Sequence, residues 1–278
     1  MVDKGTRAVE AGAGDRVGLV RICRYTLGED PTYGIVQGDP GAEWIAEIQG
    51  DPLYQPVVVT GNRVRLDDAR LLAPVIPRSK VIGIGQNYAA HAREMGSEAP
   101  KEPLMFLVPN TAVVGPGDPV VMPRQSKEVH YEGELAVVIS RMCKDVPLER
   151  VHDVIFGYTC ANDVTARDLQ KSDGQWSRAK GFDSFCPLGP WIETDLDTGD
   201  LSIVTRRDGK VVQDGRTSGM THNVAALVAH VSATFTLLPG DVILTGTPAG
   251  VGPVASGQRV EVEIEGIGTL SNPFIRRD

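Results

Sequence analysis

The chain has 278 residues, enough to bury a substantial core in one large domain or in one main domain with an appendage. Its net charge of -8 and pI near 5.2 argue against nucleic-acid and anionic-membrane surfaces, because both need basic patches. An anionic substrate would therefore need local positive charge, from a metal ion or from a few placed cations. The 31 glycines and 19 prolines indicate many turns, and hence many strands.

The start of the chain predicts no targeting segment. The opening "MVDKGTRAVEAGAGDR" lacks the apolar stretch of a signal peptide, and no apolar run approaches the roughly 18 residues of a membrane span. The four cysteines are widely spaced, with no C-x-x-C pair and no histidines at zinc-finger spacing, which indicates reduced thiols. We therefore expect a cytoplasmic protein whose residues 1–15 form a disordered leader.

A change of composition divides the rest of the chain. Short β-like runs, "VGLVRICRY" and "TYGIVQ", predict a small N-terminal domain over residues 16–75. The segment "LLAPVIPRSK", residues 71–80, concentrates proline and basic residues, and each X-Pro step disfavours regular structure. We place the domain boundary there and expect a second, larger domain over residues 76–278.

The larger domain shows many short strand patterns and one long helical pattern. Apolar residues recur at helical spacing over residues 222–238, and Pro239-Gly240 is expected to stop that helix. Strands do not alternate with long helices, which disfavours a doubly wound parallel sheet. The sequence predicts a mainly β fold with a few helices (α+β), built as a sandwich-like or rolled body.

Near the start of this domain, "GIGQNYAAHAREMG" lacks the third glycine of a dinucleotide-binding fingerprint and predicts a short helix instead. Asn87 is the expected N-cap, good helix formers continue to Met95, and Gly96 ends the helix. His91 and Glu94 then lie on one face. A carboxylate beside an imidazole raises its basicity and orients it, as a general base requires. An ordinary surface pair is the alternative.

The segment "HYEGELAVVI", residues 130–139, places two carboxylates in an otherwise apolar strand pattern. Side chains alternate along a strand, so Glu132 and Glu134 share one face. Two buried carboxylates without a cation would cost several kcal/mol each in desolvation and would repel one another. A divalent metal removes both penalties, and oxygen-only ligands suit Mg²⁺, Mn²⁺ or Ca²⁺ better than Zn²⁺. In the alternative, the strand ends at Gly133 and both carboxylates are solvated.

A third carboxylate follows the next apolar run, "IFGYTCAN". Asp163, at the end of that strand, would complete a three-carboxylate site. Arg167 and Gln170 come next and would share one face of a helical turn, where the guanidinium could clamp a substrate carboxylate. A surface pair of Arg167 with Asp168 or Glu134 is the alternative.

Two loops add further candidates. Lys180 lies in the aromatic loop "DGQWSRAKGFDSFCPLGPW" and would sit near a buried anion, or simply be solvated. In "LLPGDVILTGTPAGVGPV", a strand from Val242 to Thr245 runs into a glycine-rich turn with Thr247. Backbone N–H groups and the hydroxyl there could hold an oxyanion or carboxylate, or the segment is a plain tight turn. No Cys/His cluster, P-loop or G-x-S-x-G elbow occurs, which excludes three common enzyme classes.

Taken together, these motifs resemble the fumarylacetoacetate hydrolase family over about residues 80–273, in the family's order. The resemblance implies a mixed β-sandwich roll, a homodimer, and a divalent metal. By position, it implies metal ligands at Glu132, Glu134 and Asp163, a catalytic pair on a lid helix at His91 and Glu94, a catalytic Lys180, and substrate contacts at Arg167, Gln170 and Thr247. Gln86 is a departure, because relatives often have arginine there.

The resemblance implies a reaction on a small anionic 2-oxo acid with Mg²⁺ or Mn²⁺, for which Ca²⁺ could substitute. The metal would stabilise an enolate while a C–C bond breaks, either in hydrolysis of an acylpyruvate by water activated at His91 or in decarboxylation of oxaloacetate. Isomerisation of an unsaturated 2-hydroxy diacid in aromatic catabolism is an alternative. A non-catalytic metabolite-binding member of the family and a structural β-rich protein are the others. No nucleic acid or membrane is expected as a partner.

Overall fold

The computed structural model describes residues 20–277, which fold mainly as β-strands with a few helices and confirm the predicted fold class. The leader predicted over residues 1–15 lies outside the described residues. No helix within residues 20–277 is long and apolar enough to cross a membrane. All four cysteines are free thiols.

The largest sheet has twelve strands, ten of them in the order β4-β3-β2-β1-β14-β12-β11-β17-β6-β7, while β5 pairs with β1 and β8 pairs with β14. The sheet is mixed, because β17 runs parallel to β6 and β14 parallel to β8, whereas the other pairs are antiparallel. Its strands are β1 (Arg21–Thr26), β2 (Thr32–Gln37), β3 (Trp44–Ile48), β4 (Val59–Arg65), β5 (Arg70–Leu72), β6 (Val81–Gly85), β7 (Leu104–Val108), β8 (Val113–Val114), β11 (Gly133–Ile139), β12 (Ile155–Asn162), β14 (Cys186–Glu193) and β17 (Val242–Leu244).

Two smaller sheets complete the body. A five-stranded sheet has the order β16-β15-β19-β20-β9, and a three-stranded sheet has the order β13-β10-β18. Strands β15, β19 and β20 pack against β11, β12 and β14, so the two larger sheets form a sandwich. The bounds are β9 (Val120–Met122), β10 (Val129–Tyr131), β13 (Thr165–Ala166), β15 (Ser202–Arg207), β16 (Lys210–Arg216), β18 (Gly252–Pro253), β19 (Arg259–Ile264) and β20 (Gly268–Arg276).

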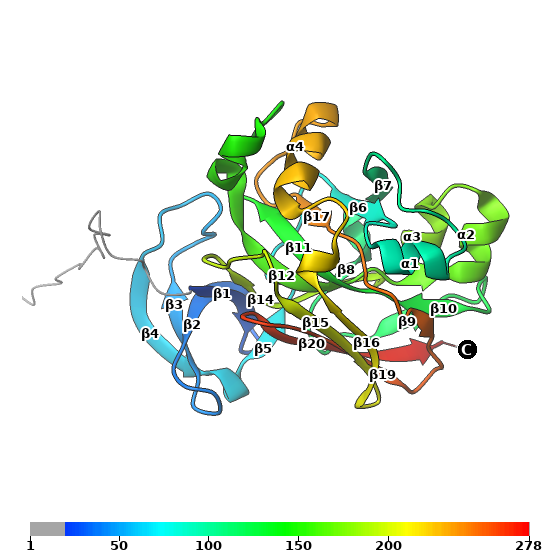
Figure 1. The fold of residues 1–278 in the computed structure, drawn as a ribbon. Helices are drawn as coiled ribbons and strands as arrows, with labels where there is room; N and C mark the ends of the chain where they lie inside the picture. Colours follow the sequence, from blue (N-terminus) through cyan, green and yellow to red (C-terminus); the bar gives the residue numbers. More distant parts are fainter. Residues whose placement is uncertain (1–19, 278) are drawn as a thin grey trace, which may run out of the picture.

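Short helices flank the sheets. Figure 1 shows α1, α2 and α3 together at the end of the body opposite β1–β4. The α-helices are α1 (Ala89–Glu94), α2 (Arg167–Asp173), α3 (Ser177–Lys180) and α4 (Val224–Thr234), and the 3-10 helices are η1 (Leu66–Asp68), η2 (Asn110–Ala112), η3 (Leu148–Val154) and η4 (Thr217–Gly219).

Helix α4 is the long helix that the sequence predicted, but it is shorter than the expected 222–238. It begins after Asn223, whose side chain accepts a hydrogen bond from the Ala226 N–H at 2.9 Å. It ends at Thr234, well before Pro239. The chain turns extended at Phe235 because Leu237 exchanges two backbone hydrogen bonds with Cys143. This tertiary pairing, and not the Pro-Gly step, stops the helix.

The N-terminal strands β1–β5 continue the main sheet. Strand β1 pairs antiparallel with β14, with Arg21 opposite Glu193 and Ile22 opposite Ile192. Figure 1 shows this region (blue) at one edge of the body, away from α1–α3. The residues of the predicted N-terminal domain therefore extend one end of the sheet, while the candidate site residues lie in the rest of the chain.

Candidate active site

Glu132 and Glu134 flank the start of β11, a strand buried on both faces. Leu135, Val137 and Ile139 belong to the core shared with α4 and the five-stranded sheet, whereas Ala136 and Val138 belong to the core on the opposite face. Only 4% of the surface of Glu132 and 1% of that of Glu134 is exposed. The alternative in which both carboxylates are solvated is therefore wrong.

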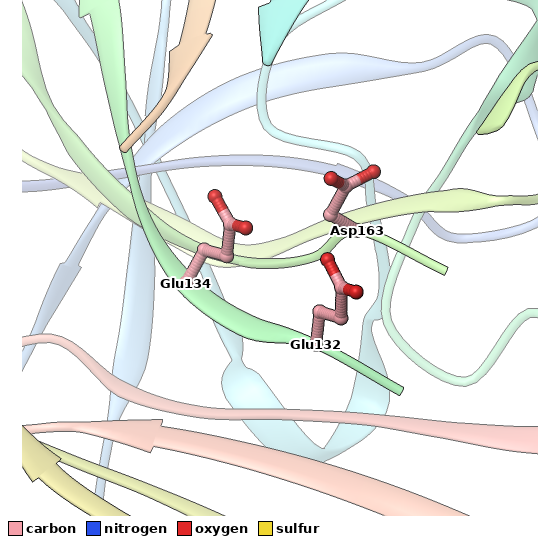
Figure 2. Close-up of side chains that lie close together, drawn as sticks. All are labelled: Glu132, Glu134 and Asp163. Atoms are coloured by element: carbon pink, nitrogen blue, oxygen red, sulfur yellow. The ribbon is translucent and has the colours of Figure 1, made fainter. Parts of the chain in front are cut away.

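Asp163 completes the cluster from the neighbouring strand. The β11–β12 register sets Gly133 opposite Asn162, and the Asp163 N–H donates to the Glu132 carbonyl at 2.9 Å. Figure 2 shows the three carboxylates turned toward a common space. One carboxylate oxygen from each lies within 4.8 Å of the other two, so one ion could contact all three.

Two buried cations accompany the carboxylates. The Lys180 ammonium, at the end of α3, donates to Glu132 Oε2 at 2.7 Å and to Asp163 Oδ2 at 2.5 Å. Arg167, at the start of α2, donates to Glu132 Oε1 and also to Gln170 Oε1, the latter at 2.7 Å. The solvated alternative for Lys180 and the surface pair for Arg167 are both wrong, because each residue is at most 3% exposed.

The charges of this cluster do not balance. Three carboxylates face two cations, which leaves one negative charge uncompensated in a buried site. Burial and the nearby carboxylates of Asp163 and Glu132 raise the pKa of Glu134 well above its ordinary value. Burial would also raise the pKa of Glu132, but Lys180 and Arg167 outweigh burial and hold it below its ordinary value. The metal-free cluster therefore favours a proton on Glu134, and a bound metal ion would take the place of that proton.

The three carboxylates fit a divalent metal ion. The buried Oδ1 of Asp163 has no hydrogen-bond partner within residues 20–277, so one ligand atom is available. All three donors are carboxylate oxygens, the type that Mg²⁺ and Mn²⁺ prefer. With all three carboxylates ionised, a divalent cation would change the summed charge from -1 to +1. The residues present are therefore suited to hold Mg²⁺ or Mn²⁺.

Helix α1 brings an imidazole to the same cavity. His91 is 5% exposed, and its Nδ1 lies 3.1 Å from Glu94 Oε2. Glu94 also accepts the Gly250 N–H at 3.0 Å. An ionised carboxylate only accepts hydrogen bonds, so this contact assigns the proton to Nδ1 and leaves Nε2 as a base. The predicted proximity of His91 and Glu94 is confirmed, and Gly96, at φ 76°, follows the helix end as expected.

The predicted N-cap of α1 is wrong. Tyr88 occupies the cap position and makes no side-chain cap hydrogen bond. The buried Asn87 amide donates instead to the Thr245 carbonyl at 2.8 Å and to the His222 carbonyl at 3.0 Å, and it accepts the His222 N–H at 2.9 Å. Both polar atoms of the Asn87 side chain therefore bond to backbone groups far along the chain and do not form a local cap.

A small cavity joins these groups. Eight of the nine candidate residues from the sequence line this cavity. The exception is Glu94, which contacts the His91 ring. The cavity also contacts residues that the sequence did not single out as contacts, among them Phe106 and Trp176, whose rings meet edge to face. Gln86 lines it too, with a positive φ of 58°. The lining candidates are His91, Glu132, Glu134, Asp163, Arg167, Gln170, Lys180 and Thr247.

Two amide side chains support the ligand segment and were missed from the sequence as site residues. Asn162 Oδ1 accepts the Glu132 N–H at 2.9 Å, and Gln213 Oε1 accepts the Gly133 N–H at 3.0 Å. Both are buried. In the sequence, each of these residues is a single amide within a strand pattern, in "TCAND" and in "KVVQDG". Nothing in either segment indicates which distant backbone group the amide will bind.

Comparison with known proteins extends these observations. The family model "Fumarylacetoacetate (FAA) hydrolase C-terminal" matches residues 80–275, and "Rv2993c-like, N-terminal" matches residues 20–74. The chain is 44% identical over 217 residues to oxaloacetate tautomerase fahd2 of Xenopus laevis, which covers 74% of this chain and 68% of that protein.

Two solved structures show the same fold. The 5-carboxymethyl-2-hydroxymuconate delta-isomerase of Mycobacterium smegmatis has a TM-score of 0.86 at 50% identity, covering 92% of this chain and all of that one. The fumarylpyruvate hydrolase of Pseudomonas aeruginosa, in complex with Mn²⁺ and pyruvate, has a TM-score of 0.69 at 35% identity, covering 75% of this chain and 92% of that one.

Proposed function

The chain belongs to the fumarylacetoacetate hydrolase family, and we propose that it is a divalent-metal-dependent enzyme that moves a proton at C3 of a small 2-oxo acid. One observation carries the proposal: a carboxylate-backed imidazole and a buried cluster of three carboxylates face one cavity. The similar isomerase and tautomerase support it, because proton transfer next to a keto group accounts for their named reactions.

Glu132, Glu134 and Asp163 would hold Mg²⁺ or Mn²⁺. The metal, when bound, supplies Lewis-acid charge that stabilises negative charge developing on the 2-oxo oxygen. Lys180 and Arg167 keep two further positive charges within the buried cluster and favour an anionic substrate over a neutral one. Both cations would then lie close to an enolate bound at the metal.

His91 would act as the base at C3. Glu94 fixes its Nδ1–H tautomer, so Nε2 removes the C3 proton and then returns it to the same or a conjugated carbon. The Gly250 N–H holds Glu94 in place, and the burial of His91 limits competing water. Isomerisation or tautomerisation needs no group beyond these.

Hydrolytic cleavage of an acylpyruvate is the second candidate. The carboxylate-backed His91 favours it, because such a pair also activates water, and the similar fumarylpyruvate hydrolase supports it. Decarboxylation of oxaloacetate needs no base and would depend on the cations alone.

One experiment separates these reactions. Purified protein with Mg²⁺ or Mn²⁺, or with EDTA, is incubated in D₂O with oxaloacetate and with acetylpyruvate, and both are followed by NMR. Metal-dependent loss of C3 protons with an intact carbon skeleton, faster than without protein, supports proton transfer. Acetate with pyruvate indicates hydrolysis, and pyruvate from oxaloacetate indicates decarboxylation. No protein-dependent change in either substrate would refute the proposal.

A further inference from the structure

We infer that Gln213 and Thr247 are positioning residues that hold the Glu132-Gly133-Glu134 segment in its metal-binding geometry. The inference rests on the proposed function, since it assigns these residues a role in the same site. The Gln213 side chain accepts the Gly133 N–H at 3.0 Å and donates to Thr247 Oγ1 at 2.8 Å. Thr247 Oγ1 in turn donates to the Gly133 carbonyl at 2.8 Å. The three residues form a closed ring of hydrogen bonds, here called the Gly133 clamp.

The clamp replaces a missing neighbour strand. On one side β11 pairs with β12 along its length, but on the other side β17 pairs only with residues 136–138. Gly133 lies beyond that pairing, where its buried N–H and carbonyl need other partners. An amide and a hydroxyl supply them. On this side, the backbone between the two glutamates is therefore held by side chains rather than by a neighbouring strand.

Close packing makes the clamp rigid. A Cβ atom at position 133 would lie 2.1 Å from Thr205 Oγ1, so the ligand segment passes directly against β15. Gln213 belongs to β16, which pairs with β15 in the five-stranded sheet. Both Gln213 and Thr247 are at most 2% exposed. The clamp thus connects the ligand segment to the second layer of the sandwich.

The ring also restricts what Thr247 can do. A hydroxyl can donate only one hydrogen bond, and the Thr247 hydroxyl donates it to the Gly133 carbonyl. Thr247 cannot donate to a substrate carboxylate without opening the clamp, although it lines the cavity. The clamp therefore gives Thr247 a role in metal affinity, beside the substrate contact expected from the resemblance.

Gln213 has one further partner. Its Nε2 also donates to the Pro248 carbonyl at 2.8 Å, in the turn whose Gly250 N–H holds Glu94. Loss of the Gln213 amide should therefore loosen both the metal ligands and the base, whereas loss of the Thr247 hydroxyl should affect mainly the ligands.

The test measures Mn²⁺ binding from the free-ion EPR signal, independently of activity. Thr247→Val and Gln213→Met should each raise the Kd for Mn²⁺ by about tenfold or more, the usual effect of removing a group that supports metal ligands. Thr247→Ser, which keeps the hydroxyl, should bind Mn²⁺ like the wild type. The double variant should be little worse than either single one, because either change opens the ring.

Ser232→Ala is the matched control. Ser232 is buried in α4, where it donates to the Ala229 carbonyl at 2.9 Å and accepts the Val146 N–H at 3.0 Å. The alanine variant therefore loses a similar pair of hydrogen bonds, far along the chain from the metal ligands. Metal-free thermal unfolding of each variant shows that it is folded. Ser232→Ala should leave the Kd for Mn²⁺ unchanged.

Three results would overturn the inference. Thr247→Val could bind Mn²⁺ normally while the KM of the 2-oxo acid rises, which would make Thr247 a substrate contact. The effects of the two changes could add fully, which would make the residues independent. Ser232→Ala could weaken Mn²⁺ binding equally, which would make the effect one of general stability. A wild type that binds no Mn²⁺ would refute the proposed function itself.

Discussion

Lys180→Met offers a direct test of the charge balance in the site. In the metal-free protein the Lys180 ammonium contacts Glu132 at 2.7 Å and Asp163 at 2.5 Å, with only 2% of its side chain exposed. With all three carboxylates ionised, its removal changes the summed charge of the cluster from -1 to -2. Breaking one partner out of a buried ion pair costs about 3–5 kcal/mol. At about 2–4 °C per kcal/mol for a chain of nearly this size, the metal-free Tm should fall by roughly 6–20 °C.

Divalent metal should rescue this variant more than it stabilises the wild type. Mn²⁺ at a hundred times its Kd stabilises a native state by about 2.7 kcal/mol. With all three carboxylates ionised, the ion changes the summed charge from -2 to 0 in Lys180→Met, whereas in the wild type it changes that charge from -1 to +1. Mn²⁺ should therefore bind the variant more tightly, and at equal concentration it should raise the variant's Tm by more.

The assay is thermal unfolding of both proteins in EDTA and in Mn²⁺. Lys80→Met is the control, because Lys80 pairs at 2.7 Å with the fully buried Asp241. Lys80→Met should lower the Tm in both conditions by a similar amount. The reasoning fails if metal-free Lys180→Met melts with the wild type, or if Mn²⁺ raises the Tm of Lys180→Met and wild type equally.

Three further outcomes are expected. Glu132→Gln should weaken Mn²⁺ binding by more than the roughly 10–100-fold typical of supporting residues, and a normal Kd would contradict the ligand assignment. It should also lower the metal-free Tm, because Lys180 and Arg167 lose the buried carboxylate that they share. His91→Ala should slow C3 deuterium exchange by about 10²–10⁴-fold with Mn²⁺ affinity unchanged; undiminished exchange by NMR would point to another base. Burial raises the pKa of Cys23 to about 12 and also raises the thiol pKa values of Cys160 and Cys186, so all three stay protonated at pH 8. Thiol titration should find at most one fast-reacting cysteine in the native protein and four after unfolding; rapid reaction of several native thiols would contradict the burial.

Local sequence patterns predicted the strands and the helix that carry most of the candidate site residues. Alternating polarity predicted that Glu132 and Glu134 share a face of an internal strand, and the apolar run before Asp163 predicted its place at a strand end. The spacing of His91 and Glu94 predicted their contact. These features follow from the periodicity of single strands and helices, which is a local property of the chain.

Which groups contact one another depends on the packing of segments that lie far apart in the sequence. Lys180 contacts a carboxylate 48 residues away, and Gln213 binds a backbone group 80 residues away. The amide expected to cap a helix, that of Asn87, instead binds a carbonyl 158 residues away, and Leu237 ends α4 by pairing with Cys143. Such partners are set by sheet order and register, because a buried polar group takes whichever partner the packed layers place beside it. The sequence pattern of a single segment therefore does not predict which distant group will bond to its buried polar side chains.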